Sequence, residues 1–319
     1  MKNILFIASE AVPFIKTGGL ADVVGSLPKC FDKQYFDVRV MIPKYLCIKE
    51  SFRNEMKYVN HFYMDYLGQN RYVGILEYEY EGVTFYFIDN ESYFWGDRPY
   101  GDWYYDLEKF SFFCKAALSS LPVIGFKPDV IHCHDWQTGM IPALLKIQYA
   151  QFPFYQDMKT VYTIHNLQYQ GVFPIKAVQD TLGLGDSLFT SDKLECYGCA
   201  NYMKAGLVYA DELTTVSPSY ADEIQTAFYG ERLDGLLRAR KDQLVGILNG
   251  IDVAHYNPES DPLVPYHFTI EDRTGKARCK REIQRLFGLN QESEWPLLAS
   301  VARLVEQKGI ELIREILPQ

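Results

Sequence analysis

The sequence has little of what membrane spans and basic nucleic-acid surfaces are made from. It contains no apolar run long enough to cross a bilayer, so it predicts no membrane-spanning helix. Acidic residues outnumber basic ones by 41 to 32, and the formal net charge of −9 argues against a general nucleic-acid-binding protein. The apolar start is short and has no clear small-residue cleavage site, so it is better interpreted as a first strand than as a signal peptide.

Cysteine is too sparse and too irregularly spaced for a disulfide framework. The chain has 7 cysteines among 319 residues, an odd number in a protein that is not small. Cys196 and Cys199 form a C-x-x-C pair, but no second such pair follows, so a structural zinc site is poorly supported. Chance spacing and a redox pair both remain open. A reducing cytoplasm fits this cysteine usage best.

Two common nucleotide-binding signatures are also missing. The sequence has neither the G-x-G-x-x-G dinucleotide fingerprint nor the G-x-x-x-x-G-K-[ST] phosphate loop. A nicotinamide oxidoreductase is therefore disfavoured, although the order of its secondary structure would be similar.

Short apolar runs alternate with helical patterns, and this predicts an α/β fold with a mainly parallel sheet. A β-hairpin insertion is expected around Glu81 and Gly82. After the first strand, apolar residues at helical spacing predict a helix over residues 20–27. The strands are expected at residues 3–9, 37–43, 72–89 (the hairpin), 128–135, 159–166, the start of 210–224, and 243–252.

The composition changes after this α/β region. Residues 1–252 are expected to form one Rossmann-like domain, and the Pro-rich, acidic stretch 253–292 with its charged helix is expected to be a linker. Residues 293–319 then start afresh as strand, loop and helix. Because a lone strand and helix cannot bury a core, we expect this segment to be only the start of a second Rossmann-like domain.

The stretch "FIKTGGLADVVGSLP" stands at the junction of the first strand and its helix. Ligands of open α/β sheets collect at the carboxyl ends of strands, and helix N-termini attract phosphates. Gly18 and Gly19 permit close backbone approach, and Lys16 supplies a cation. A phosphate-binding loop and a simple glycine turn with a solvated lysine are both compatible with these residues.

Polar side chains also close two later strands. His132 and His134 fall on one face of a strand, but no third metal ligand is obvious. Asp135 and Trp136 follow at the turn, where they either orient a polar ligand or cap a helix. In "TIHNLQYQG", His165 either bonds a ligand or is a satisfied core histidine.

Two further stretches have both a functional and a structural interpretation. The aromatics in residues 92–110 either stack on sugar rings or pack against one another as the core of their own loop. Arg303 and Lys308 flank a loop before a helix, where two cations either bind a diphosphate or are simply solvated.

Taken together, these stretches resemble the bacterial glycogen synthase and plant starch synthase family, the family-five glycosyltransferases. The resemblance rests on "KTGGLADVVGSLP", "YGDWYYDLEKF", "DVIHCHDWQTGMIPALL", "YTIHNLQYQG", "LTTVSPSYADEI", "GILNGID" and "VARLVEQKGIELI". It implies a GT-B architecture and retaining transfer of glucose from ADP-glucose to the non-reducing end of an α-1,4-glucan, with no metal or other cofactor.

The resemblance also implies roles for individual residues. His165 would contact the transferring glucose, and Asp22 would bind sugar or steady its loop. The donor and its diphosphate would be held by Lys16, Gly18, Gly19, Arg303 and Lys308. The cleft wall or glucan side would include Asp135, Trp136, Asn166 and Asn249.

One departure limits the expected activity. The acidic catalytic motif and nucleotide-base pocket of the family would lie beyond residue 319. We therefore expect little or no transferase activity from these residues alone. The alternatives are a related GT-B enzyme that uses UDP-glucose and a non-catalytic glucan-binding fragment.

Overall fold

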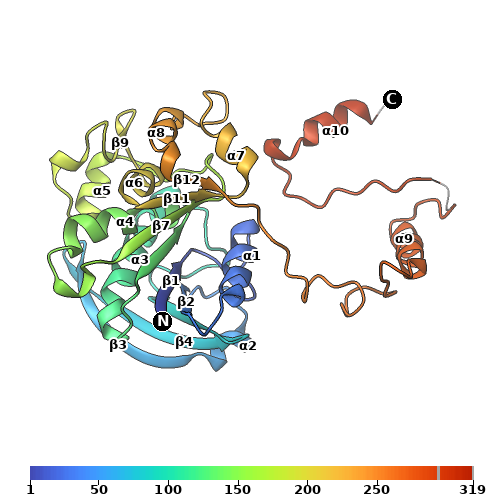
Figure 1. Cartoon of the computed structure of the whole chain (residues 1–319), viewed down its shortest axis with the longest axis horizontal. Helices are drawn as coiled ribbons and strands as arrows, with labels where there is room; N and C mark the ends of the chain where they lie inside the picture. The colour runs from blue at the N-terminus through green and yellow to red at the C-terminus, as the bar shows by residue number, and fades with distance from the viewer. Residues whose placement is uncertain (293–294, 318–319) are drawn as a thin grey trace. The chain divides into compact units, whose positions relative to one another are not determined.

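A computed structural model describes residues 1–292 and 295–317. The chain divides into two compact units, Met1–Gly250 and Ile251–Gln319, which are drawn in Figure 1. The ends of the segment expected to start a second domain, residues 293–294 and 318–319, lie outside the described residues.

A nine-stranded sheet forms the centre of unit 1, in the order β12-β11-β7-β6-β1-β2-β5-β4-β3. Neighbours from β12 to β5 pair in parallel, while β4 pairs antiparallel with both β5 and β3. The predicted parallel sheet with a hairpin is thereby confirmed. The strands are β1 (Lys2–Ile7), β2 (Phe36–Pro43), β3 (Lys57–Tyr66), β4 (Gln69–Tyr80), β5 (Val83–Asp89), β6 (Val130–His134), β7 (Lys159–Ile164), β11 (Glu212–Thr215) and β12 (Leu244–Gly246).

The central strands are apolar because helices cover both faces of a parallel sheet. Leu5, Phe6 and Ile7 of β1 are fully buried, and Figure 1 shows helices beside the strands of this unit. The helices of unit 1 are α1 (Gly19–Ser26), α2 (Glu50–Glu55), α3 (Trp103–Val123), α4 (Met140–Leu144), α5 (Ile175–Leu182), α6 (Tyr202–Tyr209), α7 (Pro218–Glu223) and α8 (Asp234–Ala239).

Helix α3 was not predicted from the sequence. It begins inside the aromatic stretch 92–110, where the Asp102 side chain accepts a 2.9 Å hydrogen bond from the Tyr105 N–H and caps it. Apolar residues surround much of this helix, so it lacks the one-sided period that marks a surface helix. Within the stretch, Tyr93, Phe94 and Phe110 are buried as core, whereas Trp95 and Trp103 are exposed.

A second, three-stranded sheet packs the strands β8 (Val172–Phe173), β10 (Cys199–Asn201) and β9 (Glu195–Cys196) in that order. Both pairs are antiparallel. Strands β9 and β10 are joined by Tyr197 and Gly198, whose φ values of 51° and 81° are those of a tight hairpin turn. This small sheet was also missed, because its strands are too short to show a period.

Unit 2 contains α9 (Thr274–Leu286), the predicted charged helix, and α10 (Ile310–Ile316). The strand expected before α10 is absent, since residues 295–305 of the described chain contain none. Leu298 and Val301 are 91% and 100% exposed, so this apolar run has neither a partner strand nor a core among the described residues. A strand gains its hydrogen bonds only from neighbours, which explains the wrong prediction.

Candidate active site

Three parallel strands of unit 1 end beside one another, and each is followed by polar side chains. In the sheet order, β1 lies between β2 and β6, and β7 follows β6. Residues after β1 include Glu10, those after β6 include Asp135, and those after β7 include His165. The carboxyl ends of such strands are where open α/β sheets bind ligands. This edge is therefore the candidate site.

Asp135 ties the end of β6 to the end of β7. Its Oδ1 accepts hydrogen bonds from the backbone N–H groups of His165 at 2.7 Å and of Asn166 at 3.4 Å. Asp135 adopts φ 54°, a left-handed conformation that side chains other than glycine rarely take. Such strain is retained where the surrounding structure or function requires it. The structure thus brings together three of the predicted site residues.

Three histidine rings lie close together behind this connection. The His134 Nδ1 lies 3.0 Å from the His165 Nε2, and the His132 Nε2 lies 2.6 Å from the Thr163 hydroxyl. The rings of His132 and His134 stack with centroids 4.3 Å apart. Among the described residues, no group of three or more His, Cys, Asp or Glu side chains is arranged to hold a metal. The contact with His134 orients the His165 ring, and contact of His165 with a ligand stays a prediction.

Burial governs the charge of these groups. It lowers the pKa of His165 to about 4 and that of His132 to about 3, so both imidazoles are neutral at pH 7. Burial also raises the pKa of Asp135 to about 7, against the opposing effect of the two backbone hydrogen bonds. The nearby charge of Glu10 adds to that increase.

Glu10 anchors the loop between β1 and α1. Its carboxylate accepts hydrogen bonds from the Thr17 backbone N–H and from the Thr17 hydroxyl, the latter at 2.9 Å. The Tyr100 hydroxyl lies 3.2 Å from the same carboxylate and 2.6 Å from the Ser9 hydroxyl. Sequence reasoning missed Glu10, and it considered Tyr100 only as one of the aromatics in residues 92–110. A glutamate directly after a buried strand was the available signal for Glu10.

The loop between β1 and α1, here called the glycine-rich loop, carries Lys16 at the surface, and Asp22 lies in the first turn of α1. Lys16 Nζ forms an ion pair with Asp22 Oδ1 at 2.7 Å, so these two predicted residues lie together. Gly18 is the N-cap of α1 and Gly19 is its first residue. A Cβ atom at either glycine would meet nothing within 4 Å, which leaves open space beside the helix N-terminus.

An aromatic cavity of 420 Å³ adjoins Trp136. Its lining includes Trp103, Gln170, Gly171 and Arg232. A Cβ on Gly171 would come within 2.3 Å of the Trp136 ring, so only glycine lets this backbone approach the indole. Trp103 donates a 2.9 Å hydrogen bond from its indole nitrogen to the Val172 carbonyl, which fixes the exposed ring at the rim.

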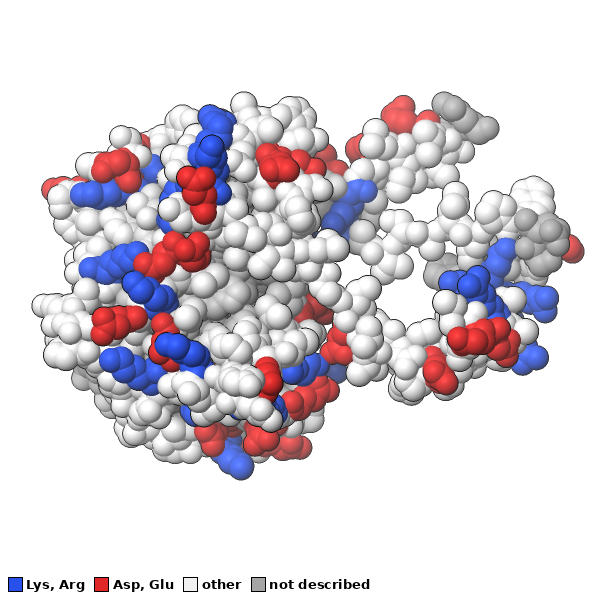
Figure 2. All heavy atoms as spheres, in the orientation of Figure 1, with Lys and Arg blue, Asp and Glu red and all other residues white. Residues whose placement is uncertain are grey.

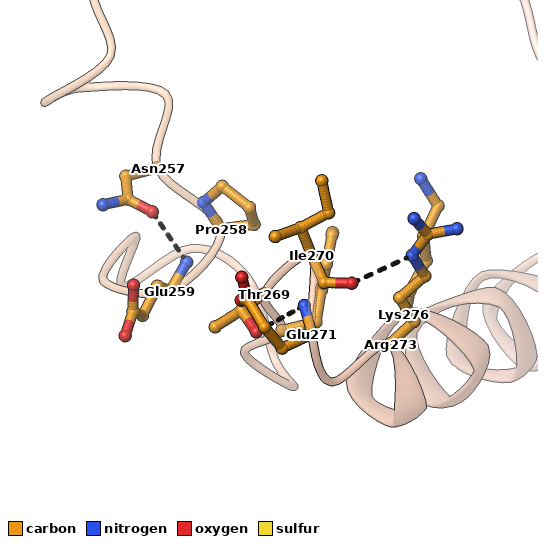
Figure 3. A pocket seen from close by; sticks show the side chains of 9 residues that line it. Asn257, Pro258, Glu259, Thr269, Ile270, Glu271, Arg273 and Lys276 are labelled. Atoms are coloured by element: carbon orange, nitrogen blue, oxygen red, sulfur yellow. Dashed lines mark hydrogen bonds between the residues drawn. The ribbon is translucent and has the colours of Figure 1, made fainter.

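Other predicted residues lie apart from this cluster. Asn249 is exposed near the end of unit 1, and Arg303 and Lys308 belong to unit 2, so their roles stay predictions. Unit 2 also has a hollow of 470 Å³, lined by residues such as Asn257, Thr269 and Arg273. Figure 3 shows that hydrogen bonds in its wall satisfy local turns. That hollow therefore offers no comparable arrangement of buried polar groups.

Charge and hydropathy add little to the location of a site. On the face drawn in Figure 2, basic and acidic side chains are interspersed over unit 1. Within the described ranges, none of the helices is both long and apolar enough to traverse a bilayer.

Comparisons with known proteins agree with this fold. The starch synthase catalytic domain family matches residues 3–239. The chain is 56% identical to a glycogen synthase of Lachnospira eligens over its whole length, and 52% identical to one of Lachnoclostridium phytofermentans over 98% of it. It covers 67% and 66% of those two proteins.

A solved structure is similar as well. The catalytic domain of starch synthase IV from Arabidopsis thaliana, bound to ADP and acarbose, superposes with a TM-score of 0.90 at 33% identity. The match covers 98% of this chain and 65% of that one. The chain therefore spans about two thirds of the proteins it matches, and it belongs to the starch synthase catalytic domain family, with that family's GT-B type of α/β fold.

Proposed function

We propose that the chain supplies the glucan side and part of the donor side of a glycogen synthase. The reaction is retaining transfer of glucose from ADP-glucose to the non-reducing end of an α-1,4-glucan. The observation that carries the proposal is the Asp135–His165 connection at the carboxyl edge of the sheet, beside an aromatic cavity. The likeness to a starch synthase bound to ADP and acarbose supports it.

The chemistry requires two kinds of stabilisation. Cleavage of a sugar–diphosphate bond leaves negative charge on the diphosphate and develops positive charge on the sugar ring. Lys16, beside open space at the N-terminus of α1, supplies a cation that stabilises the negative charge on the diphosphate. His165 is neutral at pH 7, so it acts on the sugar through a hydrogen bond and adds no positive charge beside the developing cation.

The glucan acceptor fits the aromatic cavity. Trp103 and Trp136 contribute indole rings to its lining, and the Gln170 and Arg232 side chains supply hydrogen-bonding groups. Such a mixture of apolar faces and a few polar groups is typical of ligand sites. Asp22, Asn166 and Asn249 are proposed to contribute at the edges of the donor and acceptor sites.

Donor selection and turnover require more than unit 1. We propose that Arg303 and Lys308 of unit 2 hold the diphosphate. In the described part of unit 2, apolar residues such as Leu298 and Val301 are exposed. We therefore propose that these 319 residues alone transfer little glucose. We also propose a cytoplasmic enzyme that does not act on nucleic acid.

A chimera tests this function. The chain is joined after residue 319 to the remaining third of the Lachnospira eligens glycogen synthase, and labelled glucose transfer to maltoheptaose is measured. We expect transfer from ADP-glucose by the chimera and little transfer by the unjoined chain. Maltoheptaose binding without transfer by the chimera would favour the glucan-binding alternative.

A further inference from the structure

The C-x-x-C pair lies in a position that its sequence spacing does not reveal. Cys196 ends β9 and Cys199 begins β10, and the two are direct partners in the antiparallel register. Both side chains are half-buried, so solvent reaches them. Because directly opposite residues project from the same face of a sheet, the two thiols lie side by side.

The spacing allows a bridge with some strain. Opposite residues of an antiparallel pair have Cα atoms about 4.5–5.5 Å apart, which falls within the range of disulfides. Their Cβ atoms are about 4.5–5.5 Å apart, at or just above the upper limit for disulfides. Closing the bridge therefore draws β9 and β10 together. Strained and exposed disulfides are the ones that are readily reduced.

The hairpin is connected to the aromatic cavity by two contacts. The Asn201 side chain, on β10, donates a 2.6 Å hydrogen bond to the Gln170 side chain, which lines the cavity. On the other side, the Arg232 guanidinium lies over the Tyr197 ring, 5.2 Å from its centroid, and also lines the cavity. Strand β10 pairs with β8, whose two residues form part of the same wall.

We propose that Cys196 and Cys199 are a reversible thiol–disulfide site, and that the bridge weakens glucan binding in the adjoining cavity. The bridge draws β9 and β10 together and so shifts the turn that carries Tyr197 and the strand that carries Asn201. The contacts of these two residues with Arg232 and Gln170 then change. The effect on glucan rests on the proposed function, whereas formation of the bridge does not.

The oxidant is a small-molecule disulfide such as oxidised glutathione. One cysteine thiolate attacks a glutathione sulfur, which forms a mixed disulfide and releases one glutathione thiolate. The thiolate of the second cysteine then attacks the sulfur of the first cysteine in this mixed disulfide, which forms the Cys196–Cys199 bond and releases the second glutathione as a thiolate. The two protein thiols lose two electrons and two protons, and one glutathione disulfide becomes two glutathione thiols.

Mass spectrometry tests the bridge: the full 319-residue chain is treated first and then digested with trypsin. Trypsin cuts after Lys193 and Lys204, so both cysteines fall in one peptide, 194–204, which contains no other cysteine. Incubation with oxidised glutathione is expected to make this peptide lighter by two hydrogen atoms, and dithiothreitol is expected to reverse the change. In a Cys199→Ser chain, the same peptide should instead carry one glutathione on Cys196.

Calorimetric titration with maltoheptaose tests the coupling. We expect the bridged chain to bind about five- to tenfold more weakly than the reduced chain, the equivalent of one lost hydrogen bond. Cys30 is exposed and lies outside the hairpin, so Cys30→Ser is the control. Oxidation should weaken maltoheptaose binding by this variant as much as it weakens binding by the wild type. Peptide 194–204 staying reduced while Cys30 is glutathionylated would overturn the site.

The two halves of the proposal fail separately. A bridged chain with unchanged affinity for maltoheptaose would overturn the coupling and leave the bridge. A reduced chain that does not bind maltoheptaose would contradict the proposed function and with it the coupling, while the peptide mass would still decide whether the bridge forms.

Discussion

The Oδ1 atom of Asp135 accepts a hydrogen bond from the His165 backbone N–H at 2.7 Å. This contact fixes the segment after β7 against the end of β6. It places the His165 ring where its Nε2 meets the His134 Nδ1 at 3.0 Å. The position of His165, the proposed sugar-contacting residue, is therefore set by His134 at the end of β6 and by Asp135 directly after it.

Replacement of Asp135 by Asn should change how stability depends on pH. Burial raises the pKa of Asp135 from its ordinary 3.8 to about 7. A raised pKa means that the folded chain holds the proton more tightly, so the stabilisation is complete below pH 4 and is lost as pH rises to 7. The slope is at most about 1.4 kcal/mol per pH unit.

Urea unfolding of the wild type and of Asp135→Asn, from pH 4 to 8, measures how the free energy of unfolding depends on pH. Asn retains an oxygen acceptor for the His165 N–H and cannot ionise. Relative to wild type, the variant should be more stable at pH 7.5 than at pH 4.5. A stability difference that does not vary with pH would contradict a raised pKa for Asp135.

Glu10 should control the mobility of the glycine-rich loop. Loss of its carboxylate in Glu10→Ala leaves the Thr17 N–H without its acceptor. Hydrogen bonds to charged groups contribute about 1.5–3 kcal/mol, so the Thr17 amide should exchange about 10- to 100-fold faster. Amide hydrogen exchange provides the measurement, and Glu91→Ala, at an exposed glutamate, is the matched control. Unchanged exchange at Thr17 would show that Glu10 is not the anchor.

Gly139 should tolerate no side chain. A Cβ there would lie 2.0 Å from the Tyr202 carbonyl oxygen at the start of α6, and neither backbone can yield easily. We expect Gly139→Ala to lower the free energy of unfolding by about 1–3 kcal/mol in urea. Gly185→Ala, where a Cβ meets nothing within 4 Å, should leave it nearly unchanged. Equal stability of the two variants would contradict close α4–α6 packing.

Trp103 should contribute to glucan affinity through its exposed face. The ring is 57% exposed at the rim of the aromatic cavity, so its removal disturbs little of the core. Trp103→Ala is expected to weaken maltoheptaose binding by about 2- to 10-fold, the value of one aromatic contact. Tyr35→Ala, at a 62% exposed aromatic on the approach to β2, is the control for calorimetry. An affinity equal to that of wild type would remove Trp103 from the acceptor site.

Much of unit 1 could be predicted because its signals are local. Buried parallel strands such as β1 are continuous apolar runs, and the hairpin turn is marked by Glu81 and Gly82. Polar residues directly after such strands must meet at one edge of the sheet, so the proximity of Asp135 and His165 could be predicted without coordinates.

The missed features depend on distant partners. Glu10 matters because Thr17 and Tyr100 turn towards it, and no spacing in the sequence records that approach. Helix α3 is buried on several sides and therefore lacks a clear period. The apolar run around Val301 has the composition of a strand but finds no neighbour in the described part of the chain.

The rate of glucose transfer by a His165→Ala chimera tests the central claim most directly. The substitution removes the imidazole and keeps the backbone N–H that Asp135 holds, so the fold of the site should persist. With His61→Ala, an exposed histidine on β3, as control, we expect transfer from ADP-glucose to fall about 100-fold only in the His165 variant. Transfer at the wild-type rate by His165→Ala would contradict the account.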